Sequence, residues 1–134
     1  MERTIKILLS LFVIFNFALP LNAEDNVSLV TPQNVEFKLC TRTYIITPEK
    51  LFYMAIAAVK ENRFTVDEIQ SKMGYILFTA VGKQYLASVV KVDDTHSMIK
   101  ITPVNNNYFF APGIVLNFFR YIDLNGATPI VPLS

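Results

Sequence analysis

The chain has 134 residues, of which 52% are hydrophobic and 17% charged, and its formal net charge is +1 at pH 7. This length corresponds to one domain with one hydrophobic core. The 12 Lys and Arg residues form no run, whereas nucleic-acid binding depends on neutralising many phosphates with such residues. The composition therefore argues against a nucleic-acid partner.

The first 23 residues have the pattern of a secretory signal peptide. Arg3 and Lys6 provide a positive start, residues 7–15 are apolar apart from one serine, and Ala23 offers a small residue at a cleavage position. We expect cleavage after Ala23. A retained membrane anchor is the alternative, but the apolar run is shorter than the ~20 residues that cross a bilayer.

Cleavage at this point would leave a chain of zero net charge, because Arg3 and Lys6 are removed from the 12 basic residues and Glu2 from the 11 acidic ones. We expect an exported protein, periplasmic or extracellular, with no membrane span after signal cleavage. The rest of the chain divides into a polar, flexible lead-in (24–34), a single domain (35–126) and an irregular C-terminal tail with two prolines (127–134).

The segment 64–104 predicts four strands in succession, since it is rich in β-branched and aromatic residues. Gly82 lies in a short break between two of the apolar runs, which is typical of a hairpin. A further strand is expected over residues 35–46. Whether residues 41–43 within it form a turn or continue the strand is left open.

Two helices flank the four strands. Thr47 supplies a hydroxyl N-cap and Pro48 suits the first helical position, so a helix is expected from there to about Asn62. A second helix is expected from near Pro112 to about Leu124, where apolar residues recur at a spacing of four.

The order strand, helix, four strands, helix predicts an α+β fold of two layers, with an antiparallel sheet and two helices on one face. The order β-α-β-β-β-β-α resembles that of helix-grip (TATA-binding-protein-like) domains, including the repeat domains of outer-membrane-assembly lipoproteins. Thr47-Pro48, the strand at 64–66 and the segment 74–78 carry this resemblance, which covers most of residues 35–124. It is a pattern of elements, the lipoprotein cysteine is absent, and no functional residue transfers. A ferredoxin-like arrangement is the competing topology.

Residues with catalytic or metal-binding chemistry are sparse. Cys40 is the single cysteine and is expected to be a buried thiol in a strand. His96 is the single histidine, and its cluster with Asp93 and Asp94 has the composition of a solvated turn. We therefore predict no enzyme activity, no metal and no cofactor.

Aromatic residues are concentrated near the second helix. Neighbouring aromatic side chains on one helix cannot all face the same side, so some should be exposed or should contact a partner. The central strands are also apolar on both faces, with Phe78 on one face and Leu77 on the other. The predicted partner or ligand surface consists of Phe109, Phe110, Phe119 and Tyr121.

These features favour a non-catalytic binding or scaffold module of the cell envelope. It would engage an envelope protein, or itself by self-association, through apolar sheet or helix surface. The alternative is a small carrier of an apolar ligand held between the sheet and the C-terminal helix. That alternative requires a cavity lined by residues such as Phe78, Val90, Phe118 and Ile122.

Overall fold

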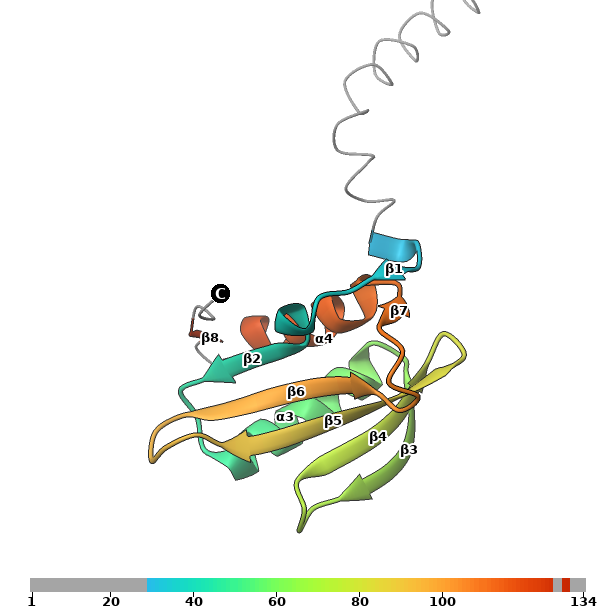
Figure 1. Ribbon diagram of the computed structural model, residues 1–134. Coiled ribbons are helices and arrows are strands. Elements are labelled where there is room, and N and C mark those ends of the chain that lie inside the picture. Colours follow the sequence, from blue (N-terminus) through green and yellow to red (C-terminus); the bar gives the residue numbers. More distant parts are fainter. Residues whose placement is uncertain (1–28, 127–128, 131–134) are drawn as a thin grey trace, which may run out of the picture.

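The computed structural model describes residues 29–126 and 129–130. Within them the chain forms a six-stranded antiparallel sheet, a small sheet of two short strands and two α-helices (Figure 1). The main elements follow the order β-α-β-β-β-β-α, which confirms the predicted α+β fold. The predicted signal peptide and the remainder of the C-terminal tail lie outside the described residues.

The large sheet has the strand order β3-β4-β5-β6-β2-β8, and β1 pairs with β7 in the small sheet. Because four strands follow one another between the helices, this is not the ferredoxin-like βαββαβ order. The strands are β1 (Gln33–Asn34), β2 (Thr41–Tyr44), β3 (Thr65–Gln70), β4 (Tyr75–Ala80), β5 (Lys83–Lys91), β6 (Ser97–Pro103), β7 (Phe109–Phe110) and β8 (Pro129–Ile130). The helices are the 3₁₀ helix η1 (Phe37–Cys40) and the α-helices α3 (Pro48–Glu61) and α4 (Gly113–Leu124).

Helix α3 begins and ends where its sequence predicts. The Thr47 hydroxyl oxygen accepts a hydrogen bond from the Lys50 backbone N–H at 3.3 Å, and Pro48 occupies the first turn. At the other end, the Asn62 side chain donates to the Ala58 carbonyl at 2.8 Å. The Thr47 hydroxyl thus satisfies a backbone N–H that the helix leaves without a partner, and the Asn62 side chain adds a second bond to a carbonyl that already accepts from the Asn62 backbone N–H.

The predicted hairpin at Gly82 is present. Val81 and Gly82 connect β4 to β5 with φ angles of 50° and 77°, so both loop residues are left-handed. A two-residue hairpin turn whose twist matches that of the flanking strands requires positive φ at both of its residues. Glycine tolerates this backbone without strain.

The expected strand over 35–46 is only partly formed. Residues Phe37–Cys40 form η1, and Thr41–Tyr44 alone pair with β6, so the prediction that Cys40 lies in a strand is wrong. Strand β3, in contrast, extends through Gln70 and includes a bulge between Val66 and Glu68. Alternation of apolar and polar residues does not reveal either boundary, because hydrogen-bond pairing decides both.

Both helices cover the same face of the large sheet, called here the inner face, and lie behind the sheet in the view of Figure 1. Phe78 on β4 is at the centre of the core: its ring stacks with Phe64, Tyr85 and Phe118 at centroid distances of 5.5 to 6.0 Å. Six inner-face side chains of the central strands have no exposed surface: Ile76, Phe78, Tyr85, Ala87, Ile99 and Ile101. Among residues 29–126 and 129–130, no helix combines the length and apolarity needed to span a membrane.

Parts of both terminal segments are ordered against the domain. Gln33 and Asn34 pair with β7, and the Val35 backbone N–H donates to the Tyr108 carbonyl at 2.8 Å. Within the tail that was expected to be irregular, Pro129–Ile130 pair with β2 at the edge of the large sheet. These segments are held by contacts with residues far away in the sequence, so local composition does not predict their order.

Candidate functional site

The face of the large sheet opposite the helices, called here the outer face, has no covering element among the described residues (Figure 1). Leu77 on β4 and Leu86 on β5 lie directly opposite each other at its centre. Glu68 on β3 flanks Leu77, and Thr102 on β6 flanks Leu86. These four residues form one row across the sheet, with an apolar middle and polar ends.

A shallow depression of about 670 Å³ lies over this row. The Tyr75 hydroxyl at its border donates a hydrogen bond to Glu68 Oε2 at 3.1 Å, and this bond to the carboxylate raises the pKa of Tyr75. The depression is lined by Glu68, Tyr75, Leu77, Leu86, Thr102, Pro103, Val104 and Asn106. An apolar floor with a few polar groups at the border is the usual character of a recognition surface.

The neighbouring rows of the outer face are more polar. Tyr75 lies opposite Ser88, and Ser88 lies opposite Lys100. In the part of the chain that the structure describes, the Lys100 ammonium takes part in no ion pair. Unlike Lys100, Asp67 has partners within the face. Its carboxylate accepts hydrogen bonds from the side chains of Thr79, at 2.6 Å, and Gln84, and these bonds lower the pKa of Asp67.

The four aromatic residues predicted as a partner surface do not lie together. Phe109 is 51% exposed and Tyr121 is partly buried, whereas Phe110 and Phe119 are core residues, 3% and 1% exposed. Phe110 contacts Tyr85 edge to face at 5.2 Å. Phe110 and Phe119 therefore offer no surface to a partner.

Phe110 and Phe119 are buried for different reasons. Phe109 and Phe110 are successive residues of β7, so their side chains point to opposite sides. Phe118 and Phe119 are both buried because α4 packs against α3 on one side and against η1 on another, and the Arg42 guanidinium lies 5.2 Å from the Phe119 ring. A helix covered on several sides can bury adjacent positions, which the sequence pattern did not reveal.

The residues expected to line a ligand cavity also separate. The Phe78 and Phe118 rings stack at 6.0 Å and Ile122 is buried, so these three are in the packed layer between sheet and helix. Val90 is opposite Met98 on the outer face and is 40% exposed. The four residues thus line no common space, which weighs against the carrier alternative.

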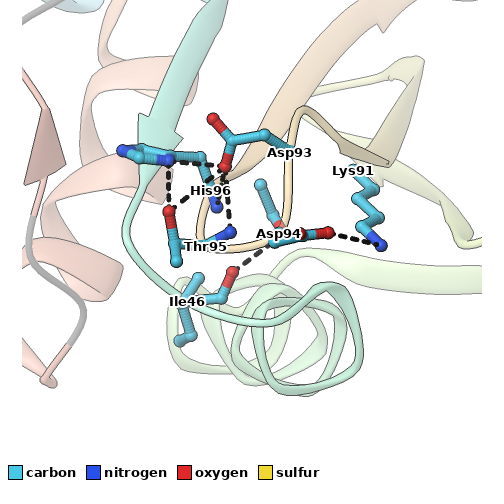
Figure 2. A network of polar contacts seen from close by, with 7 residues as sticks. Ile46, Lys91, Asp93, Asp94, Thr95 and His96 are labelled. Atoms are coloured by element: carbon cyan, nitrogen blue, oxygen red, sulfur yellow. Dashed lines mark hydrogen bonds and ion pairs between the residues drawn. The ribbon is translucent and has the colours of Figure 1, made fainter.

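The cluster around His96 forms a hydrogen-bonded turn between β5 and β6 (Figure 2). Asp93 Oδ1 accepts hydrogen bonds from the backbone N–H groups of Thr95 and His96 at 2.9 and 2.8 Å and lies 2.7 Å from His96 Nδ1. The contact with the His96 ring is the main cause that lowers the pKa of Asp93 to about 2. Asp94 instead pairs with Lys91 at 3.7 Å.

This turn does not resemble a metal centre. Over the described ranges, no group of three or more His, Cys, Asp or Glu residues could hold a metal ion. Next to the turn, the Ser97 hydroxyl donates to the Ile46 carbonyl at 2.9 Å and fixes the start of β6. The polar groups of this region are therefore used to shape the turn.

Cys40 is fully buried, as predicted, and burial raises the pKa of its thiol to about 11. Cys40 precedes Thr41, which pairs with Lys100, whereas His96 precedes Ser97, which pairs with Tyr44. The thiol and the imidazole are thus at opposite ends of the β2–β6 pair. They do not form the hydrogen-bonded nucleophile and base that thiol catalysis needs.

Comparisons of the chain with protein-family models, with curated proteins and with solved structures give no match. The sequence predicts part of the outer face, since it places Leu77 on a second apolar side of the sheet. The neighbours of Leu77 in its row across the sheet, Glu68, Leu86 and Thr102, are not predictable from one sequence, because the strand register aligns them.

Proposed function

We propose that this protein is an exported, non-catalytic binding module of the cell envelope that holds a protein partner on the outer face of its sheet. The observation that carries the proposal is the uncovered row with Leu77 and Leu86 at its centre, beneath the depression of about 670 Å³. Sheets with one covered face usually present polar side chains to solvent on the other. An apolar centre on the open face is therefore a favourable site for a partner.

The chemistry elsewhere in the described residues supports a binding role over a catalytic one. The thiol of Cys40 is buried and protonated at neutral pH, because its pKa is raised to about 11. The imidazole of His96 is engaged by Asp93 within its own turn. The thiol and the imidazole lie at opposite ends of the β2–β6 pair, so they do not form a nucleophile with its base.

The export part of the proposal is supported by the N-terminal sequence, and it has its own test. The full chain would be expressed in a bacterial host and recovered from the periplasm. N-terminal sequencing or intact mass measurement is expected to show a chain that begins at Glu24. An intact N-terminus that stays with the membrane fraction would favour the retained anchor. The helix-grip resemblance stays a prediction that contributes no residue to this site.

The binding part is tested by affinity capture from an envelope extract with a charge placed at the centre of the outer face. Leu86→Lys is expected to abolish capture of the partner, because an ammonium in the apolar row would have to be desolvated on binding. Leu124→Lys is the matched control, since Leu124 is 72% exposed at the end of α4. Equal capture by both variants, with unchanged circular dichroism spectra, would remove the outer face from consideration.

A further inference from the structure

We propose that the partner on the outer face is a second copy of this chain, packed face to face so that Glu68 of each copy pairs with Lys100 of the other. This inference depends on the proposed binding role of the outer face and specifies its occupant. A two-fold interface requires one patch to be complementary to itself. The cross-strand register of the outer face meets that requirement in shape and in charge.

The positions of the charges come from the strand order. Within the run β3-β4-β5-β6, Glu68 lies on the first strand and Lys100 on the last, with the apolar residues on the two strands between them. We place the two-fold axis between the two packed sheets, parallel to the strands and above the gap between β4 and β5. Rotation about this axis puts β3 of one copy over β6 of the other, and β4 over β5. The small rotation between packed sheets does not alter this correspondence.

The rows then match one another across the interface. Leu77 of one copy faces Leu86 of the other, because both belong to the same row on the two central strands. In the next row, the large Tyr75 side chain faces the small Ser88 of the second copy. Apolar meets apolar and large meets small, which favours close packing of the two sheets.

The charged residues match in the same way. Glu68 faces the position of Thr102 on the second copy, and Lys100 follows two residues away on the same face, about 7 Å along the strand. A lysine side chain spans that distance. Lys100 takes part in no ion pair among the described residues, so it is available, and the symmetry creates this pair twice.

The remaining carboxylate of this region does not compete for Lys100. Asp67 accepts hydrogen bonds from Thr79 and Gln84 within its own copy. Those contacts keep it at the end of the face away from Lys100, since Thr79 lies four residues along β4 from Tyr75, which shares a row with Lys100. Glu68 accepts a single hydrogen bond, from Tyr75 to Oε2, and lies nearer to the Lys100 row, so it is the carboxylate that the arrangement presents to the second copy.

The test is the oligomeric state of the exported chain, measured by sedimentation velocity or light scattering over a concentration series. A dimer is expected. Glu68→Lys and Lys100→Glu each replace two attractive pairs by two repulsive ones, so each should raise the dimer dissociation constant by about tenfold or more. The double variant restores opposite charges with exchanged positions and should dimerise like the natural chain. Glu61→Lys, at an exposed position at the end of α3, is the matched control and should leave the dimer unchanged.

Failure of this inference is distinguishable from failure of the proposed function. A chain that stays monomeric at every concentration overturns the second copy as occupant, and so does a dimer that ignores both charge reversals. If Leu86→Lys still abolishes capture of a different envelope protein, the binding role of the outer face stands with another partner. If Leu86→Lys changes neither dimerisation nor capture, both proposals fall.

Discussion

Arg42 on β2 and Asp123 on α4 form an ion pair in which Nη1 donates to Oδ2 at 2.7 Å, although the two residues are 81 positions apart in sequence. The Tyr44 hydroxyl donates to the other oxygen of the same carboxylate at 2.9 Å. Both charged side chains are about three-quarters buried, 25% and 28% exposed. One carboxylate therefore joins the last turn of α4 to two residues of β2, and it contributes to holding the helix on the inner face.

Replacing Asp123 with alanine should lower the free energy of unfolding by about 2–4 kcal/mol, since it leaves a largely buried guanidinium without its partner. Urea unfolding at pH 7 measures this loss. Asp94→Ala is the control, because Asp94 pairs with Lys91 in solvent at 3.7 Å and the change should have little effect on stability. Equal losses for both variants would show that the Arg42 pair does not anchor α4.

Tyr44 and Tyr85 provide a matched comparison, because both are fully buried but only the Tyr44 hydroxyl has a hydrogen-bond partner among the described residues. Tyr44→Phe should cost about 1–2 kcal/mol, since it removes a bond to a charged group. Tyr85→Phe should be neutral or stabilising, because it removes a buried hydroxyl that has no partner. Thermal unfolding of the two variants shows whether each change raises or lowers the melting temperature. A lower melting temperature for Tyr85→Phe would contradict the prediction.

The same two tyrosines predict how stability depends on alkaline pH. Burial raises the pKa of Tyr85 to about 12, and burial followed by the Asp123 contact raises the pKa of Tyr44 further. A raised folded pKa gives stability that is complete below the ordinary tyrosine value of 10 and is lost as the pH rises above it. Unfolding measured by tyrosine absorbance should therefore begin above about pH 10 and proceed cooperatively.

Much of the architecture could be predicted from local sequence. Thr47-Pro48 marks the start of α3, and Gly82 marks the β4–β5 turn, because capping and left-handed turns depend on the residues at those positions. The order of helices and strands followed from these signals and from apolar periodicity. All of these are interactions between near neighbours in sequence.

What the sequence did not reveal depends on distant pairing. The 3₁₀ turn at Cys40 replaced an expected strand, and the pairing of β1 with β7 joined residues about 75 positions apart. For the site, the aromatic content pointed to Phe119, which the Arg42 side chain and α4 packing bury. The outer face depends on the register of four strands, and register is set by contacts that composition does not encode.

Cys40 should be inert to thiol reagents in the folded protein. Its pKa is raised from 9.0 to about 11, which lowers the thiolate fraction about a hundredfold at neutral pH, and its side chain has no exposed surface. Labelling with iodoacetamide should be slow in buffer and fast in urea. A Cys40→Ala variant with Ser71→Cys, at an exposed turn position, is the control and should react at once. Rapid native labelling of Cys40 would show that η1 opens readily.

Gly113 at the start of α4 allows the N-terminal segment to lie against the helix. A Cβ at this position would be 2.8 Å from the Leu29 carbonyl oxygen, so Gly113→Ala should displace residues 29–34 and cost about 1–3 kcal/mol. Hydrogen exchange at Val35 reports this, because its N–H donates to the Tyr108 carbonyl. Gly82→Ala meets no atom within 4 Å but strains the left-handed backbone of the β4–β5 turn, so it controls for general destabilisation and should leave residues 29–34 in place.

Asp93 should make the stability of the β5–β6 turn depend on acid pH. Its folded pKa is lowered to about 2 from 3.8, first by the His96 ring and then by the Thr95 backbone N–H. A lowered folded pKa gives stability that is present above the ordinary value and is lost as the pH falls through 2. Asp93→Asn keeps an acceptor in the turn but removes the charge, so the difference in melting temperature between variant and natural chain should shrink between about pH 4 and pH 2. NMR titration of the Asp93 carboxyl carbon gives the independent check, and a midpoint at the ordinary 3.8 would show that the turn does not hold the carboxylate as described.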